Sequence, residues 1–213
     1  AAPAAAAARP TRDPLVIRRL EFLGGMAEPG GWRPDAVLPE VAFAGRSNVG
    51  KSALLNRLVG RNKLARVSNT PGRTREVNFF RVNDTFVIAD LPGYGYARVS
   101  KERRATWRPL IEGYLQGSPM LRGVVLLVDI RHEPSDDDRA MRDYLGELGA
   151  PTLVTLTKAD KLKPKELVAR SQALARTLEV GEDQVVLTSA ETGQGRNELA
   201  EALVTLIEAP AWR

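Results

Sequence analysis

The stretch GRSNVGKS at residues 45–52 follows the apolar run VAFAG at residues 41–45 and precedes a run of helical character. Its two glycines, Lys51 and Ser52 fit the pattern G-x-x-x-x-G-K-[ST], in which a glycine-rich turn joins a buried strand to a helix. Backbone N–H groups and the dipole at the start of such a helix attract phosphate. A glycine turn followed by a helix with an exposed lysine is the alternative. The strand, the spacing and the helix together favour a phosphate-binding loop.

From residue 41 onward, apolar runs alternate with segments of helical period. The apolar runs, most of them typical of strands buried on both faces, lie at residues 41–45, 77–80, 85–91, 123–129, 152–158 and 184–190. Asn83 and Asp84 join the second run to the third with no room for a crossover helix, which predicts a hairpin. The pattern predicts the α/β class, with a six-stranded, mostly parallel sheet, one antiparallel strand and helices on both faces.

The composition excludes several classes of site. There is no cysteine and only one histidine, so the chain has no disulfide, thiolate metal site or multi-histidine site. No apolar run approaches the roughly 20 residues of a membrane span. The lack of cysteine fits a reducing compartment, and we expect a cytoplasmic protein. The net charge of +5 favours polyanionic partners such as nucleic acid, but it also suits any basic soluble protein.

Two regions divide the chain. Residues 1–14 are rich in alanine and poor in acids, so we expect a disordered tail, with an organelle transit peptide as the alternative. Residues 15–213 are expected to form one nucleotide-binding domain with a short N-terminal extension. In that extension, VIRRLEFLGG predicts a short element, and the prolines and glycines after it predict an irregular connection to the first strand.

A D-x-x-G motif, Asp90 to Gly93, follows the apolar run TFVIA. It lies at the carboxyl end of a predicted strand, where open α/β sheets bind ligands. A carboxylate at this place can hold Mg²⁺ through water, and the Gly93 N–H can contact a γ-phosphate. D-x-x-G is also a common turn, but its position after a buried strand favours the functional interpretation.

A TKAD motif, Thr157 to Asp160, follows TLVTL and indicates the base. The Asp160 carboxylate can accept two hydrogen bonds from guanine that adenine does not offer, and Lys158 can lie over the base plane. Thr157 stands where guanine-nucleotide proteins more often have asparagine, which leaves the N7 side of the base less certain. Ser189 and Ala190, after VVLT, can present N–H groups to the guanine O6. A charged loop without function is the alternative.

The stretches GRSNVGKS, TPGRTRE, DLPGYGYA, TKAD and TSA, in this order and spacing, resemble the translation-factor-like P-loop GTPases and most closely the EngB (YihA) family of ribosome-biogenesis GTPases. The resemblance covers residues 15–208. It implies the P-loop GTPase fold and a slow GTPase that acts as a molecular switch, with GTP or GDP and Mg²⁺ as cofactors. It also implies ribosomal RNA and large-subunit particles as partners, and a link to cell division and septation. We expect a monomer.

The expected nucleotide-binding residues lie in five loops. They are Gly45, Arg46, Ser47, Asn48, Val49, Gly50, Lys51 and Ser52; Gly72, Arg73, Thr74, Arg75 and Glu76; Asp90, Leu91, Pro92 and Gly93; Thr157, Lys158, Ala159 and Asp160; and Thr188, Ser189 and Ala190. Magnesium contacts are expected from Ser52, Thr74 and, through water, Asp90. The candidate catalytic residues are Lys51, Thr74, Gly93 and Asn48. The family pattern favours Thr74 as the switch threonine, with Thr70 as the alternative.

Hydrolysis is expected to be slow. Ras-like GTPases orient the attacking water with a glutamine directly after D-x-x-G, where this chain has Tyr94. A phenol is a poor general base at neutral pH, so we expect intrinsic turnover of about 10⁻³ per second or less. Asn48 suggests stimulation by K⁺, because some GTPases without the glutamine use an asparagine here to help bind that ion. A turn-forming role for Asn48 is the alternative. We also expect stimulation by a ribosomal partner.

The segment SKERRATWRPLIEGYL at residues 100–115 predicts a helix with an inward stripe that includes Trp107 and Tyr114. Lys101, Arg104 and Arg108 share another face, which suits either an RNA contact or plain solvation. The acidic stretch SDDDRAM predicts a helix start capped by Ser135 rather than a metal site. For His132 the sequence indicates no function beyond a turn contact.

The phosphate loop and the basic charge are also compatible with two other functions. A P-loop small-molecule kinase would share the phosphate loop but leave TKAD and TSA unexplained. A non-catalytic RNA-binding module with a vestigial nucleotide site has only the basic charge in its favour.

Overall fold

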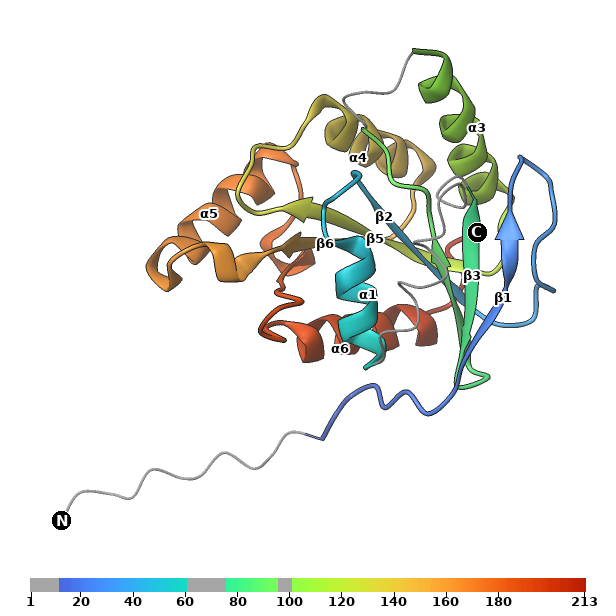
Figure 1. The fold of residues 1–213 in the computed structure, drawn as a ribbon, viewed down its shortest axis with the longest axis horizontal. Helices are drawn as coiled ribbons and strands as arrows, with labels where there is room; N and C mark the ends of the chain where they lie inside the picture. Colours follow the sequence, from blue (N-terminus) through green and yellow to red (C-terminus); the bar gives the residue numbers. More distant parts are fainter. Residues whose placement is uncertain (1–11, 61–75, 96–100) are drawn as a thin grey trace.

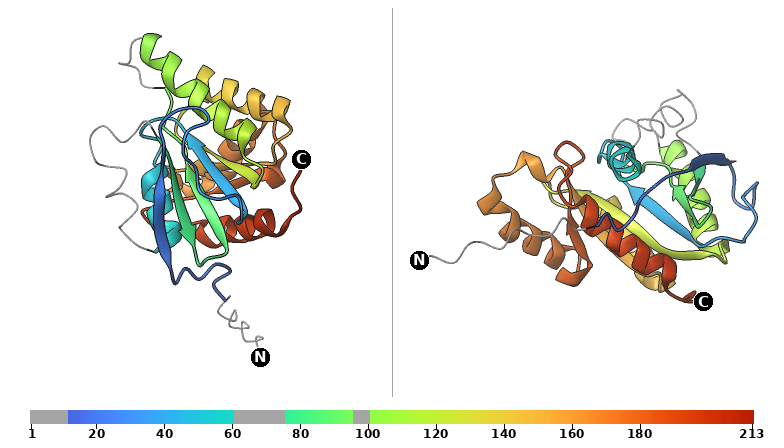
Figure 2. Two further views of the ribbon diagram at one scale, coloured as in Figure 1. Left: turned by 90° about the vertical axis from the view of Figure 1, so that its right-hand side faces the viewer. Right: turned by 90° about the horizontal axis from the view of Figure 1, so that it is seen from below.

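The computed structural model describes residues 12–60, 76–95 and 101–213, with the backbone alone described for residues 101–107. Helices lie on both faces of one central sheet (Figure 1, Figure 2). The strands are β1 (Leu20–Met26), β2 (Glu40–Gly45), β3 (Val77–Val82), β4 (Phe86–Asp90), β5 (Leu121–Asp129), β6 (Thr152–Thr157) and β7 (Val185–Leu187). The helices are α1 (Lys51–Val59), α3 (Lys101–Gly117), α4 (Asp136–Leu148), α5 (Pro164–Thr177) and α6 (Arg196–Glu208), with short 3₁₀ helices η1 (Ala159–Lys161) and η2 (Glu182–Gln184).

The strands lie in the order β1-β3-β4-β2-β5-β6-β7. β2, β4, β5, β6 and β7 run parallel, whereas β3 runs antiparallel to both of its neighbours. The hairpin predicted at Asn83 and Asp84 is present, and these residues have positive φ values of 50° and 56°, as the tightest hairpin turns require. The predicted α/β class and the single strand that runs against the others are confirmed.

The predicted count of six strands is wrong, because the sheet has seven. The additional strand is β1, for which the sequence predicted only a short element. β1 lies at the edge of the sheet, and its register shifts between Phe22 and Gly24. A Cβ atom at Gly24 would come within 2.6 Å of the Trp32 ring, so the strand needs glycine there. Glycines and an irregular register remove the alternation by which a strand is recognised in a sequence.

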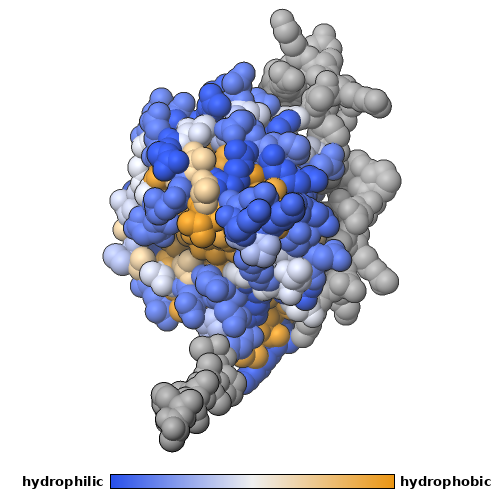
Figure 3. All heavy atoms as spheres, turned by 90° about the vertical axis from the view of Figure 1, so that its left-hand side faces the viewer, coloured by the Kyte–Doolittle hydropathy of each residue, from blue (hydrophilic) through white to orange (hydrophobic). Residues whose placement is uncertain are grey.

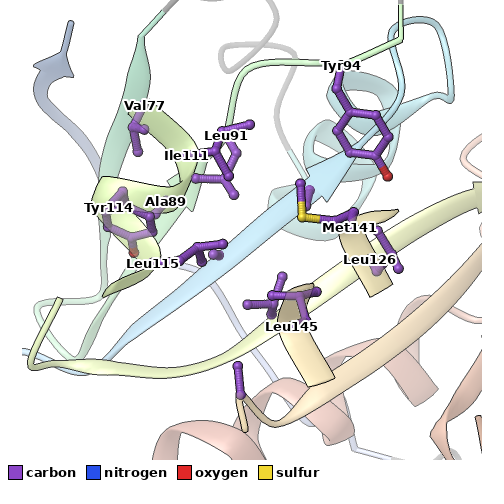
Figure 4. Close-up of a cluster of buried hydrophobic side chains, with 14 of the residues drawn as sticks. Val77, Ala89, Leu91, Tyr94, Ile111, Tyr114, Leu115, Leu126, Met141 and Leu145 are labelled. Atoms are coloured by element: carbon purple, nitrogen blue, oxygen red, sulfur yellow. The ribbon is translucent and has the colours of Figure 1, made fainter. Parts of the chain in front are cut away.

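Two clusters of buried hydrophobic side chains hold the helices to opposite faces of the sheet. α3, α4 and α5 pack on one face, and α1 and α6 pack on the other. Figure 4 shows part of the first cluster, in which Ile111, Tyr114 and Leu115 of α3 lie near Met141 and Leu145 of α4. The inward stripe predicted for α3 is confirmed at Tyr114, whereas the side chain of Trp107 lies outside the described residues.

The acidic stretch at residues 135–138 is a helix start, as predicted. The Ser135 hydroxyl accepts a hydrogen bond from the Asp138 N–H at 3.2 Å, and the Asp138 carboxylate accepts one from the Ser135 N–H at 2.9 Å. This reciprocal arrangement satisfies two backbone donors that a helix otherwise leaves unpaired. The three aspartates at residues 136–138 also lie at the positive end of the helix dipole.

A buried carboxylate fixes the C-terminal end of α3 to β2, the strand that leads into GRSNVGKS. The Glu40 side chain is 1% exposed and accepts hydrogen bonds from the Tyr114 hydroxyl at 2.8 Å, the Ser118 hydroxyl at 2.7 Å and the Arg33 guanidinium at 3.2 Å. Arg33 also donates to the Gly117 carbonyl at 2.8 Å. Burial, and then the charge of Glu40, raise the pKa of Tyr114 well above its ordinary value, so the phenol remains a hydrogen-bond donor.

The surface on the side of α5 is mostly hydrophilic, with hydrophobic residues gathered in a band near its centre and in a separate group at its lower edge (Figure 3). The most exposed large hydrophobic residue of α5 is Val168, at 63%. Among the described residues, no helix combines the length and the hydropathy that crossing a membrane requires.

Candidate nucleotide-binding site

The phosphate-loop sequence forms a turn between the end of β2 at Gly45 and the start of α1 at Lys51. A Cβ atom at Gly45 would lie 2.9 Å from the Val49 side chain, which explains the glycine. Asn48 and Gly50 have positive φ values of 64° and 101°, a conformation that asparagine and glycine tolerate best. No side chain of the described residues caps the start of α1. The first N–H groups of this helix are therefore suited to bind an anion.

A cavity of about 410 Å³ borders this turn. Its walls come from the turn, the start of α1, the start of β3 and the segment after β4. The lining residues are Arg46, Ser47, Asn48, Gly50, Lys51, Ser52, Ala53, Glu76, Asn78, Asp90, Leu91, Pro92 and Gly93. All of them except Ala53 and Asn78 are residues for which the sequence predicted contact with nucleotide or magnesium. The fold thus brings three of the five predicted loops, 45–52, Glu76 and 90–93, to one cavity.

Lys51 and Asp90 meet in this cavity. The Lys51 ammonium donates to the Asp90 carboxylate and, at 2.7 Å, to the Leu91 carbonyl. The two charged side chains are only 12% and 7% exposed, and a carboxylate buried to this extent needs a positive partner. The pair places a cation and an acidic oxygen side by side at the start of α1. Phosphate oxygens can bind the ammonium, and a hydrated cation can bind the carboxylate.

Tyr94 fixes the segment after D-x-x-G to the phosphate loop and to α4. Its N–H donates to the Gly45 carbonyl at 3.2 Å, and its carbonyl accepts from the Ser47 N–H at 2.7 Å. Its ring is 1% exposed, its hydroxyl donates to Asp138 at 3.0 Å, and Figure 4 shows it within the cluster that covers the sheet. Burial, and then Asp138, raise the pKa of Tyr94 well above its ordinary value. Tyr94 therefore holds the loop in place, and its buried phenol is not suited to act as a general base.

The TKAD loop is tied to the phosphate loop by two hydrogen bonds. The Thr157 hydroxyl donates to the Val49 carbonyl at 2.7 Å, and the Lys158 ammonium donates to the Asn48 carbonyl at 2.9 Å. Both acceptors are backbone atoms of GRSNVGKS, so the two loops hold one another in place. Thr157 has a hydroxyl where related motifs have an asparagine amide, and this hydroxyl binds the phosphate loop.

The TSA stretch lies beside TKAD. The Ala159 N–H donates to the Thr188 carbonyl at 3.0 Å, and the Ser189 hydroxyl donates to the Asp160 carboxylate at 2.6 Å. The hydrogen bond from Ser189, followed by contact with Lys161, lowers the pKa of Asp160. The carboxylate is therefore ionised at neutral pH. One of its oxygens accepts from Ser189 and the other pairs with Lys161 at 2.9 Å, and each oxygen has a further lone pair that can accept a donor of a guanine edge. Ala190 accepts a hydrogen bond from Arg57 of α1 at 2.7 Å through its carbonyl.

Asp129, at the end of β5, was not among the predicted site residues. It forms ion pairs with Lys158 at 3.0 Å and with Arg131 at 2.8 Å. Burial on its own would raise the pKa of Asp129, but the hydrogen bonds from Arg131 and Lys158 hold it well below its ordinary range. A second cavity, of about 250 Å³, borders these residues and His132. The His132 N–H donates to the Asp129 carbonyl at 3.2 Å, which is the turn contact that the sequence indicated.

Asn78 was also missed. It is 4% exposed and lines the first cavity with Asp90, and its Oδ1 atom has no hydrogen-bond partner among the described residues. The sequence does contain a signal, since one polar residue interrupts the apolar run VNFF. The predicted residues Gly72, Arg73, Thr74 and Arg75, and the alternative Thr70, lie outside the described residues.

The sequence matches the family model described as 50S ribosome-binding GTPase over residues 40–158. It is 61% identical over 199 residues, which cover 93% of this chain and 98% of the relative, to the probable GTP-binding protein EngB of Gemmatimonas aurantiaca. It is 43% identical over 194 residues, covering 91% of this chain and 94% of the relative, to the probable GTP-binding protein EngB of Desulfatibacillum aliphaticivorans.

A solved structure supports the same relationship at the level of the fold. The crystal structure of a probable GTP-binding protein EngB has a TM-score of 0.68 and 28% sequence identity, and the match covers 79% of this chain and 98% of that one. The P-loop GTPase fold expected from the sequence is therefore confirmed.

Proposed function

The chain belongs to the EngB family of GTP-binding proteins, and from this premise we propose that it is a switch that assists assembly of the large ribosomal subunit. As a member of this GTPase family it binds guanine nucleotide and hydrolyses GTP. One observation supports the proposed nucleotide site above the others: the TKAD loop donates two hydrogen bonds to the phosphate loop, at the Val49 and Asn48 carbonyls. This links a loop suited to guanine with a loop suited to phosphate.

In the proposed complex, the phosphates lie along the turn at residues 45–52 and the base lies against Lys158 and Asp160. Lys51 neutralises phosphate oxygens, and Gly93 donates its N–H to the γ-phosphate. The ionised Asp160 accepts from the guanine N1–H and N2–H₂ groups, with Ser189 and Ala190 near the O6. We propose that residues 15–213 form a single GTP-binding domain, with the remaining predicted contacts, Thr74 among them, supplied by residues 72–76.

Magnesium is the cofactor that we propose for this site. The Ser52 hydroxyl and the Asp90 carboxylate line the cavity, and oxygen atoms are the ligands that Mg²⁺ prefers. The buried Oδ1 of Asn78, which has no partner among the described residues, supports a hydrogen-bond donor such as metal-bound water in the same place. When bound, Mg²⁺ neutralises charge that develops on the phosphates.

We propose slow intrinsic hydrolysis, accelerated by K⁺ and by the ribosomal particle. Buried Tyr94 supports the slow rate, because this position offers no side chain to orient water. The positive φ of Asn48 gives weight to its alternative role as a turn former. Asn48 nevertheless lines the cavity, so the two roles are compatible.

The family relationship supports the large ribosomal subunit as the partner, in a cytoplasmic protein that acts as a monomer and affects cell division and septation through ribosome supply. The net charge of +5 is compatible with an RNA partner. Co-sedimentation with purified large-subunit particles tests the proposal. We expect more protein in the pellet with a non-hydrolysable GTP analogue than with GDP, and equal amounts in both would contradict a switch.

Two variants refine this experiment. Arg104→Glu with Arg108→Glu, on the face of α3 that the sequence predicts to be basic, is expected to weaken association without changing GDP affinity. Arg176→Glu, an exposed charge at the end of α5, is the matched control and is expected to have no effect. Phosphate transfer to a small acceptor would instead favour a kinase, and RNA binding that ignores nucleotide would favour a plain RNA-binding module.

A further inference from the structure

Two of the residues that line the phosphate cavity have a buried side-chain atom with no hydrogen-bond partner among the described residues: the Arg46 Nε, a donor, and the Asn78 Oδ1, an acceptor. Asn78 is 4% exposed. Buried polar atoms of folded proteins almost always have a partner, and those without one often lie where water or an ion binds. The Asn78 Oδ1 therefore indicates that the cavity accommodates a hydrogen-bond donor at this point.

The sheet places Asn78 directly beside Asp90. The two residues are opposite one another in the antiparallel pairing of β3 with β4. Side chains of such a pair point to the same face, with Cβ atoms about 4.5–5.5 Å apart. Both residues line the cavity together with Ser52. Asn78 is thus within reach of anything that bridges Asp90 and the start of α1.

The chemistry of the atom restricts its partner. An amide oxygen accepts hydrogen bonds and donates none, and phosphate oxygens of a nucleotide are acceptors as well. Among the described residues, the nearby Lys51 ammonium already donates to Asp90 and Leu91. Mg²⁺ keeps several of its waters in protein sites, and each such water is a strong donor. A metal-bound water can therefore donate a hydrogen bond to the Asn78 Oδ1, whereas a phosphate oxygen cannot.

We propose that Asn78 is an outer-sphere magnesium residue: its Oδ1 accepts a hydrogen bond from a water of the ion that Ser52 and Asp90 are suited to hold. Asn78 positions the hydrated ion and does not touch the reacting atoms. The inference rests on the proposed nucleotide site and adds to it a residue that none of the sequence motifs contains.

Release of a fluorescent GDP analogue, measured over a series of free Mg²⁺ concentrations, tests the proposal without any hydrolysis. The quantity compared is the Mg²⁺ concentration that slows release by half. Asn78→Ala is expected to raise it about 3- to 10-fold, as loss of one hydrogen bond predicts, and to leave GDP affinity in EDTA unchanged. Asn78→Asp keeps an acceptor in the same place and is expected to require no more Mg²⁺ than the wild type.

Thr155→Val is the matched control. The Thr155 hydroxyl of β6 is also buried without a partner among the described residues, but Thr155 does not line the cavity. GDP release from Thr155→Val should therefore depend on Mg²⁺ in the same way as release from the wild type. If Asn78→Ala does not fold, as thermal unfolding would show, Asn78→Asp decides the question alone.

Three results would overturn the inference. The first is an Asn78→Ala curve that superimposes on that of the wild type. The second is a loss of GDP affinity in Asn78→Ala that is equal with and without Mg²⁺. The third is a weakened Mg²⁺ dependence in Asn78→Asp, which is expected if the amide donates to phosphate. A wild-type protein that binds no guanine nucleotide would instead overturn the proposed nucleotide site.

Discussion

The Thr157 hydroxyl donates a 2.7 Å hydrogen bond to the Val49 carbonyl and joins two loops that lie 108 residues apart in the chain. Both atoms are buried, so the bond is not in competition with water. An asparagine at the same place would offer an amide donor; here a shorter threonine reaches the loop. The bond makes the position of the phosphate loop depend on the loop that is suited to guanine.

Thr157→Val should weaken binding of GDP and GTP alike. The change leaves the buried Val49 carbonyl without its donor, at a cost of about 1–3 kcal/mol, or roughly 5- to 150-fold in affinity if the cost appears wholly in binding. Thr157→Ser keeps the hydroxyl and should stay within about threefold of the wild type. Equilibrium titration with a fluorescent GDP analogue measures both. An equal loss for serine, which keeps the hydroxyl, would show that the hydrogen bond to Val49 alone does not explain the effect.

Asp160→Asn should change the choice of base. The ionised carboxylate accepts two donors of guanine, whereas an amide matches the altered edge of xanthine. We expect GDP affinity to fall by about 10²-fold or more and XDP affinity to rise. Competition between GDP and XDP measures the ratio, and an unchanged ratio would remove Asp160 from the base site. Lys161→Ala, which removes the neighbouring charge at 2.9 Å, is the control that should leave selectivity in place.

Tyr94→Phe should reduce stability more than catalysis. The variant removes the hydroxyl that donates to buried Asp138, at a cost of about 1–3 kcal/mol in the free energy of unfolding. Urea denaturation measures that loss. Single-turnover GTP hydrolysis should change by less than about threefold, because a buried phenol with a raised pKa takes no proton from water. A fall of several orders of magnitude would assign Tyr94 a role in the reaction.

Asn48→Ala separates the two roles considered for Asn48. If the side chain helps bind K⁺, the wild type hydrolyses GTP faster in K⁺ than in Na⁺, and the variant loses this difference. If Asn48 serves only the turn, alanine at a φ of 64° costs about 1 kcal/mol of stability and the salt response stays the same. Asn48→Gly keeps the turn and removes the side chain, so it reports on K⁺ alone.

Arg33→Ala should destabilise the fold by about 3–5 kcal/mol, because it leaves the buried Glu40 carboxylate without its cation. Chemical denaturation measures the change. Arg108→Ala breaks the exposed pair with Glu112 on α3 and should cost less than about 1 kcal/mol. Similar losses in the two variants would mean that the buried pair of Arg33 with Glu40 contributes no more to stability than an exposed pair does.

Much of the site could be predicted because its signals are local. Gly45, Gly50 and Lys51 lie within one short stretch, and the turn that they form depends on their own backbone preferences. The Ser135 cap is local in the same way, since donor and acceptor are three residues apart. Asn78 gave a weaker signal, because its importance depends on Asp90 in the neighbouring strand.

The alternation of strands and helices after residue 41, the phosphate turn and the guanine motif can all be predicted from the residues alone, because each depends on residues close to one another in the chain. In contrast, three features follow from the packed fold alone: β1 joins the sheet, Arg33 pairs with Glu40, and Asn78 lies opposite Asp90. Pairings of this kind join segments far apart in the chain, and their free energy comes from burial and charge that exist only once the strands and helices have packed.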